Sequence, residues 1–178
     1  MLRFQSGQAE AFEPLYSRYR GALYRYFARQ VSRGNVDDLF QEAWLRVIRG
    51  KSQYRPDAAF GAYLYRIAHN VLIDHYRKES HVSRPAAEKS IDPADPGIGP
   101  EDAYARQALR ASFVAALETL PTEQREAYLL HEEAGLTLEQ IAAVIGTGRE
   151  TIKSRIRYAV THLKAALDRE PQTVGRRA

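Results

Sequence analysis

The most chemically distinctive stretch of the sequence is GTGRETIKSRIRY, residues 146–158, in which four basic side chains surround two isoleucines. Ile152 and Ile156 are four residues apart, which places them on one face of a helix. If that face is buried, the outward residues are Arg149, Glu150, Lys153, Ser154 and Arg157. Arg and Lys hydrogen-bond guanine in the DNA major groove, which admits one helix. The spacing therefore predicts a DNA-reading helix, against the alternative of an ordinary amphipathic helix with a solvated basic face.

The residues that precede this stretch favour a helix-turn-helix. Thr137 can cap a short helix, with Gln140 three residues later in a capping-box arrangement. Ala142 is small, as a close crossing of two helices requires, and Gly146 suits the left-handed conformation that ends many helices. These signals together favour a helix that enters DNA over a merely solvated one.

A second group of polar residues follows helical spacing on residues 58–79. Its non-apolar side interleaves an aromatic, two basic groups and an amide: Tyr63, Arg66, Asn70 and Arg77. The loop before it offers Tyr54 and Arg55. Aromatic rings stack on bases and Arg holds phosphates, so this mixture suits strand-separated DNA. Tyr63 can equally pad the edge of a core.

The helix predicted over residues 36–50 begins with an acidic group: Asp37, Asp38, Gln41 and Glu42. Carboxylates near a helix N-terminus are favourable in themselves, and Asp37 can serve as a cap. An acidic face is nevertheless unsuited to DNA. It indicates a surface for a basic protein partner.

These groups require helices to position them, and the sequence predicts an all-α fold with two small helical domains. Residues 9–30, 36–50 and 58–79 each carry one apolar stripe, with Ile48 included in the second, and can share a core. Further helices are predicted over residues 102–120, 122–135, 137–146 and 149–168. Between them, residues 80–103 are acidic and rich in Pro and Gly, which predicts a flexible linker. The expected domains are residues 1–79 and 104–178, and two small cores are as compatible with the composition as one.

The composition of the chain limits the classes of function that it can have. Lys and Arg outnumber Asp and Glu by 13 to 8 in residues 1–79 and by 11 to 9 in residues 104–178, whereas residues 80–103 hold 2 against 5. A basic balance raises the expectation of nucleic acid binding. There is no Cys, and no apolar run is long enough to span a membrane, so we expect a cytoplasmic protein without membrane insertion. The five His are scattered, with neither a zinc-protease pattern nor a Gly-rich phosphate loop, which argues against an enzyme, a metal or another cofactor.

Three segments in order resemble the sigma factors of bacterial RNA polymerase, and most closely their small extracytoplasmic-function (ECF) group. DDLFQEAWLRVIRG is similar to that family's polymerase-binding helix, and FGAYLYRIAHNVLIDHYRKE to the helix that reads the promoter minus-ten element. LPTEQREAYLLHEEAGLTLEQIAAVIGTGRETIKSRIRYAVTHLKAAL resembles the domain that reads the minus-thirty-five element. The resemblance covers roughly residues 8–79 and 104–168.

The resemblance implies a factor that binds core polymerase, recognises both promoter elements and promotes DNA opening. The clamp helices of the largest polymerase subunit would contact Asp37, Asp38, Gln41, Glu42 and Arg46. Tyr54 and Arg55 would hold a flipped minus-ten base, and the opened strand would lie along Tyr63, Arg66, Asn70 and Arg77. Minus-thirty-five DNA would meet Arg149, Glu150, Thr151, Lys153, Ser154 and Arg157. The polymerase flap region and an anti-sigma protein are further partners that the family implies, and the acidic linker would thread the polymerase.

The sequence departs from the family pattern at two places. Glu150 stands where the family often has Gly, which bears on the promoter sequence because a carboxylate accepts from cytosine but repels phosphate. Tyr63 stands where Trp is common, and Asp74 can be a structural partner of a nearby Arg. The competing interpretation is a stand-alone DNA-binding regulator, which would have no use for the acidic helix followed by the face of Tyr, Arg and Asn.

Overall fold

The computed structural model describes residues 1–31, 33–57, 59–79 and 100–168. Within these ranges every regular element is helical, which confirms the all-α prediction. In chain order the elements are α1 (Leu2–Gln5), the 3-10 helix η1 (Ala9–Ala11), α2 (Phe12–Ala28), α3 (Arg33–Arg49), the 3-10 helix η2 (Lys51–Gln53), α4 (Phe60–Glu79), α5 (Pro100–Glu118), α6 (Thr122–Glu132), α7 (Leu138–Ile145) and α8 (Arg149–Asp168). Most of the predicted linker, residues 80–99, lies outside the described residues.

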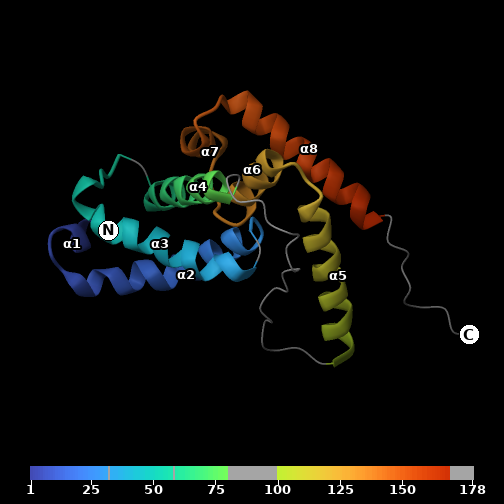
Figure 1. Ribbon diagram of the computed structural model, residues 1–178, viewed down its shortest axis with the longest axis horizontal. Coiled ribbons are helices and arrows are strands. Elements are labelled where there is room, and N and C mark those ends of the chain that lie inside the picture. Colours follow the sequence, from blue (N-terminus) through green and yellow to red (C-terminus); the bar gives the residue numbers. More distant parts are fainter. Residues whose placement is uncertain (32, 58, 80–99, 169–178) are drawn as a thin grey trace, which may run out of the picture.

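The N-terminal lobe, α1–α4, is a small bundle in which α3 packs against both α2 and α4 (Figure 1). The stripes predicted from sequence supply its core: Leu23 and Phe27 of α2, Ala43 of α3, and Leu64 and Ala68 of α4 are fully buried. Aromatic rings close the end nearest the N-terminus, where Phe12 meets Trp44 edge-on with ring centroids 5.5 Å apart. These contacts fix the outward faces of α3 and α4.

The C-terminal lobe, α5–α8, contains the predicted helix-turn-helix. Thr137 accepts from the Gln140 backbone N–H at 3.3 Å and the Gln140 side chain accepts from the Thr137 N–H at 2.9 Å, which confirms the capping box. Gly146 ends α7 with φ of 77°, a conformation that costs little without a Cβ. α8 begins three residues later and packs on α5, α6 and α7.

Three local features differ from the sequence prediction. α1 and η2 were not expected, because three or four residues are too few to show helical periodicity. Pro100 begins α5 inside the predicted linker, as suits a residue without a backbone donor in a first turn. Ile48 was expected inside, yet it is 39% exposed, because it lies beyond Trp44 at the edge of the stripe and turns towards the side of Asp37 and Gln41.

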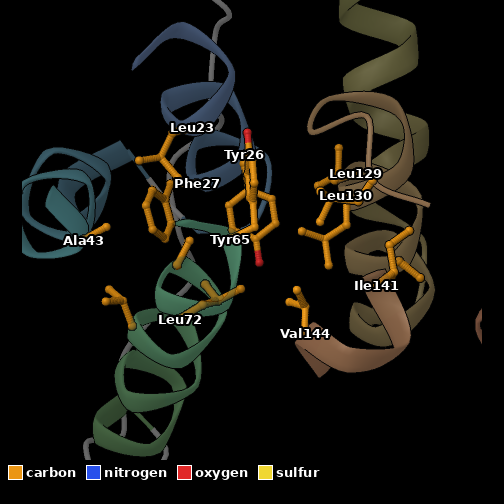
Figure 2. Packing of buried hydrophobic residues seen from close by; sticks show 14 of the residues in the cluster. Leu23, Tyr26, Phe27, Ala43, Tyr65, Leu72, Leu129, Leu130, Ile141 and Val144 are labelled. Carbon is orange, nitrogen blue, oxygen red and sulfur yellow. The ribbon is translucent and has the colours of Figure 1, made fainter. Parts of the chain in front are cut away.

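The two lobes are packed against each other. α4 lies beside α7, and buried side chains of both lobes form one continuous cluster. Figure 2 shows Tyr26 and Tyr65 at the centre of this contact, facing Leu129 and Leu130 of α6. Of the two possibilities that composition left open, the described residues show the single shared core.

Candidate nucleic-acid interface

The register of α8 agrees with the sequence prediction. Ile152 is fully buried, and Ala159 and Leu163 continue the same buried stripe. The side chain of Lys153 is 63% exposed. Glu150, Thr151 and Arg157 are also exposed, whereas Ser154 is half-buried. α8 therefore packs on its own lobe through the isoleucine side and presents a mainly basic side to solvent.

Arg149 is exposed but held by two carboxylates. Its Nε donates to Glu139 of α7 at 2.6 Å, and another guanidinium nitrogen donates to Glu150 at 2.7 Å. These hydrogen bonds, above all the one that Arg149 donates to Glu139, raise the pKa of Arg149, and the same bond lowers the pKa of Glu139. Glu150 also lies 3.9 Å from Lys153 Nζ. Each of these ion pairs must break before the Arg149 or Lys153 side chain can reach a phosphate or a guanine.

The outward face of α4 carries Arg66, Asn70 and Arg77, all of them exposed. Ile73 lies among them and is 45% exposed, so the face combines cations and an amide with an aliphatic group. Sequence reasoning missed Ile73, although its position three residues after Asn70 is the signal that would have found it. Arg77 donates to Asp74 at 3.1 Å and is not a free cation.

Of the two tyrosines predicted to stack on DNA bases, Tyr54 is buried in the lobe and Tyr63 is half-buried at its edge. Tyr54 is 8% exposed, and its ring meets that of Tyr63 at 5.1 Å between centroids. The Tyr63 hydroxyl donates to the Gly50 carbonyl at 3.2 Å. A Cβ at position 50 would lie only 3.0 Å from this hydroxyl, so a larger residue would obstruct the contact. Tyr63 therefore pads the core edge in this conformation, whereas Arg55, the other loop residue predicted to meet DNA, is exposed.

The outward face of α3 is acidic in its second turn and apolar further on, because the helix begins at Arg33, before the predicted start at residue 36, and Asp37 therefore lies within the helix and is not its cap. Asp37, Asp38 and Gln41 are exposed, and Leu45 follows them at 42% exposure, next to the exposed Ile48. Sequence reasoning found the acids but missed Leu45 and Ile48. A face that joins carboxylates to exposed aliphatic groups is typical of a protein contact.

Arg46, predicted as part of that surface, is tied into the lobe. It donates to Glu42 at 2.7 Å and to Asp74 of α4 at 3.1 Å, and these bonds raise its pKa, the Glu42 bond contributing most. Asp74 thus bridges Arg46 and Arg77, which is the structural function that its sequence position allowed. The ion pair between Arg46 and Asp74 joins α3 to α4 and so fixes the orientation of their outward faces relative to each other.

A buried carboxylate joins the two lobes, and sequence reasoning missed it. Glu126 of α6 is 5% exposed and accepts hydrogen bonds from the Tyr26 hydroxyl and His69 Nδ1, each at 2.7 Å. Burial, followed by the nearby Glu126 charge, raises the pKa of Tyr26 well above its ordinary value. The signal was the placement of Glu126 three and four residues before Leu129 and Leu130, on the apolar side of its helix.

A second acidic residue extends the contact between the lobes. Glu133 accepts from Arg25 Nε at 2.8 Å and pairs with Arg29, whose guanidinium also lies over the Phe113 ring. By contrast, the Tyr65 hydroxyl is buried with no hydrogen-bond partner among the described residues. The interface thus contains hydrogen-bonded carboxylates as well as a tyrosine hydroxyl that water would solvate better.

Two other kinds of site were sought in the described ranges. No cluster of three or more His, Asp or Glu suited to a metal ion occurs there. None of the helices in this part of the chain is long and apolar enough to cross a membrane.

Comparison with known proteins gives consistent matches. The family models for Sigma-70 region 2 and Sigma-70 region 4 match residues 15–82 and 110–163. The chain is 32% identical to the ECF RNA polymerase sigma-E factor of Escherichia coli (strain K12) over 98% of this chain and 94% of that protein. It is 32% identical to the RNA polymerase sigma factor CarQ of Myxococcus xanthus over 94% and 95% of the two chains.

Two solved structures share the arrangement. CnrH, in complex with the cytosolic domain of CnrY, is 27% identical with a TM-score of 0.66 over 92% of each chain. RpoE of Bartonella quintana, in complex with the anti-sigma factor NepR, has a TM-score of 0.75 over 90% of this chain and 99% of that one. At 23% identity, the second likeness concerns the fold alone.

Proposed function

The chain belongs to the ECF group of the sigma-70 family, and we propose that it uses three surfaces, one for core RNA polymerase and two for promoter DNA. As an ECF sigma factor it acts in promoter recognition and transcription initiation and is not an enzyme. The assignment of individual residues to the three surfaces is the proposal. Because its proposed partner is core RNA polymerase, the proposed location of the protein is the cytoplasm.

The α3 face is the proposed contact for the polymerase clamp helices. Asp37, Asp38 and Gln41 supply charge and hydrogen bonds, while Leu45 and Ile48 supply apolar area at the centre of the contact. This face is the structural observation that favours a sigma factor over a stand-alone regulator, because carboxylates are unsuited to DNA and, among the described residues, Asp37, Asp38, Gln41, Leu45 and Ile48 stay exposed rather than packed. Glu42 and Arg46 act mainly by holding the face in place.

The α4 face is the proposed contact for opened minus-ten DNA. Arg66, Asn70 and Arg77 can pair with phosphates or base edges, and Ile73 can pack against an unstacked base or a sugar. Arg55 extends the surface along the preceding loop. Tyr54 and Tyr63 support the loop from within, and either must turn outward before its ring can stack on a base.

The α8 face is the proposed contact for duplex minus-thirty-five DNA. Lys153 and Arg157 stand clear of the lobe, and Arg149 joins them once it leaves Glu139. Glu150 and Thr151 lie at the start of the helix, where recognition helices meet base edges. Ser154, half-buried beside them, is suited to a phosphate contact.

In the structure the two lobes are in contact, an arrangement that we call closed. The closed arrangement leaves each proposed DNA face accessible, but one promoter cannot contact both faces at once. The centres of the two promoter elements are roughly 25 base pairs apart, or about 85 Å at ~3.4 Å per base pair. A 20-residue helix such as α4 is only about 30 Å long, and α4 touches α7 directly. Promoter binding therefore requires the lobes to separate. Core polymerase would hold the two lobes in the separated arrangement.

Two further partners belong to the proposal. The C-terminal lobe would bind the flap region of the polymerase while α8 occupies DNA. An anti-sigma protein would bind the chain when transcription of its promoters is not needed. Family membership supports both.

Promoter selection by the reconstituted holoenzyme tests the proposed function. Core polymerase with this chain is incubated with DNA randomised across both elements, and bound fragments are sequenced. We expect two enriched motifs at a fixed spacing, and weak, strongly salt-dependent binding by the chain alone. Tight binding to one specific site by the free chain at physiological salt, with no effect of core polymerase, would establish the stand-alone regulator instead.

A further inference from the structure

The loop between α3 and α4 presents Arg55 but has few backbone hydrogen bonds of its own. Residues 50–54 form the short η2 turn, with the Gln53 N–H donating to the Gly50 carbonyl at 2.9 Å and the Tyr54 N–H donating weakly to Lys51 at 3.4 Å. Ser52, Gln53 and Arg55 are exposed. A loop so built needs support from outside itself to keep one conformation.

That support comes from α1, almost fifty residues away in sequence. The Gln5 side-chain amide nitrogen donates to the Ser52 carbonyl at 3.2 Å and to the Tyr54 carbonyl at 3.1 Å. A primary amide has two N–H groups, so one side chain satisfies two loop carbonyls at once. The Tyr54 carbonyl belongs to the peptide that leads to Arg55, so this contact fixes the direction in which Arg55 leaves the lobe.

α1 is itself anchored, although four residues cannot form a stable helix alone. Phe4 is 7% exposed and its ring lies 5.2 Å from that of Phe12. The Lys51 ammonium lies 4.9 Å above the Phe4 ring, which ties η2 to α1 a second time. Phe4 thus holds Gln5 against the loop from one side, while Tyr63 holds Gly50 from the other.

We propose that Gln5 is a positioning residue for minus-ten recognition, setting the conformation of the loop at residues 51–57 and so its preference for one promoter base. The inference rests on the proposed function, in which this loop meets the minus-ten strand. Gln5 itself touches no DNA. Its loss frees the loop to sample several conformations, which lowers discrimination between bases more than it lowers overall binding.

The test uses holoenzyme reconstituted with full-length variants. Gln5→Glu keeps the shape of the side chain but turns two donors into acceptors that face carbonyls, and Gln5→Met removes the donors without adding charge. Gln8→Glu is the matched control, since Gln8 is exposed and its side chain makes no hydrogen bond within the described residues. Arg55→Ala measures separately whether the loop contributes to recognition.

The probes are promoter fragments from the wild-type selection, pre-opened by mismatches across the minus-ten element and carrying each of the four bases in turn at every non-template position. We expect both Gln5 variants to reduce base preference at one position by about 5- to 30-fold, the equivalent of one or two hydrogen bonds. Preference in the minus-thirty-five element and affinity for core polymerase stay at the wild-type level, as does every property of Gln8→Glu.

Two results would overturn the inference. If Arg55→Ala flattens the preference while both Gln5 variants keep it, the loop recognises DNA but Gln5 does not position it. If Arg55→Ala also keeps the wild-type preference at every position, the loop has no part in recognition, and the inference fails together with that portion of the proposed function. Thermal unfolding shows whether Gln5→Glu disturbs the lobe, in which case Gln5→Met alone decides.

Discussion

Replacing Glu126 with Ala should open the contact between the two lobes. In the closed arrangement this carboxylate accepts from Tyr26 and His69, each at 2.7 Å, and is 5% exposed. The Ala variant leaves both donors buried without an acceptor, whereas separated lobes expose both donors to water. The substitution therefore penalises the closed state and leaves the open state nearly unchanged. Ala is also a strong helix former, so α6 should persist.

The size of the effect follows from the two orphaned donors. A buried donor left without its partner costs about 1–3 kcal/mol. Two such donors give a sum of about 2–6 kcal/mol, and partial relaxation and water entry favour the lower half of that range. A shift of about 2–4 kcal/mol changes the ratio of open to closed molecules by roughly 30- to 1,000-fold. Glu126→Gln keeps one acceptor oxygen and should cause a smaller shift.

Energy transfer between two dyes measures the shift directly. The chain has no Cys, so Cys introduced at the exposed Arg20 of α2 and Lys164 of α8 are its only thiols. We expect lower transfer efficiency for Glu126→Ala and no change for the control Glu132→Ala, an exposed acid on the same helix. Circular dichroism should show intact helices in both variants.

A double-mutant cycle with Tyr26→Phe isolates the hydrogen bond itself. The two substitutions should show a coupling energy of about 0.5–3 kcal/mol in the open–closed equilibrium. Alkaline pH should act in the same direction as Glu126→Ala. The pKa of Tyr26 is raised in the closed state, so its contribution is present below pH 10 and is lost as pH rises through that raised pKa. Unchanged energy transfer in Glu126→Ala, with zero coupling to Tyr26→Phe, would show that the Glu126 hydrogen bonds do not hold the two lobes together.

Two further predictions concern the partner surfaces. Ile152→Asp should unfold the C-terminal lobe because it buries an unpaired charge. Lys153→Ala should leave thermal unfolding unchanged and weaken holoenzyme binding to minus-thirty-five DNA by about 1–3 kcal/mol if Lys153 reads a base. An Ile152→Asp variant that folds, beside a Lys153→Ala variant that unfolds, would mean that α8 faces the other way. Reversing Asp38 and Glu42 to Lys together should abolish binding to core polymerase in a pull-down while the lobe keeps its helicity, with Asp38→Lys alone as the variant that spares the Glu42–Arg46 pair. Normal core binding by the double variant would exclude the α3 face as the contact.

The elements that sequence predicted well are those with local physical causes. The Thr137 capping box, the turn at Gly146 and the burial of Ile152 depend on residues within a few positions of one another. Helical periodicity and capping are properties of such short windows, which is why the helix-turn-helix could be inferred with its register. The acidic group of Asp37 and Asp38 was visible for the same reason, although α3 begins earlier than predicted, at Arg33.

The features that sequence did not predict depend on partners far along the chain. The contact between Gln5 and the loop spans almost fifty residues, and that between Tyr26 and Glu126 spans one hundred. Nothing local distinguishes Tyr54, which the fold buries, from Arg55, which it exposes. Tertiary packing decides which of these two adjacent side chains is exposed to solvent.

The composition of the interface between the lobes explains how it can be both specific and separable. Tyr26 and Tyr65 bring apolar area, but Glu126, Glu133, Arg25 and Arg29 must all lose water when the lobes meet. Buried charges recover that loss only through good geometry, so they fix one arrangement while adding little net stability. The buried Tyr65 hydroxyl, without a partner among the described residues, even favours separation. Because the α3, α4 and α8 faces all stay exposed in the closed form, we propose that the contact restrains this sigma factor by limiting the distance that its two proposed DNA faces can span, and that a partner which binds both lobes would release it.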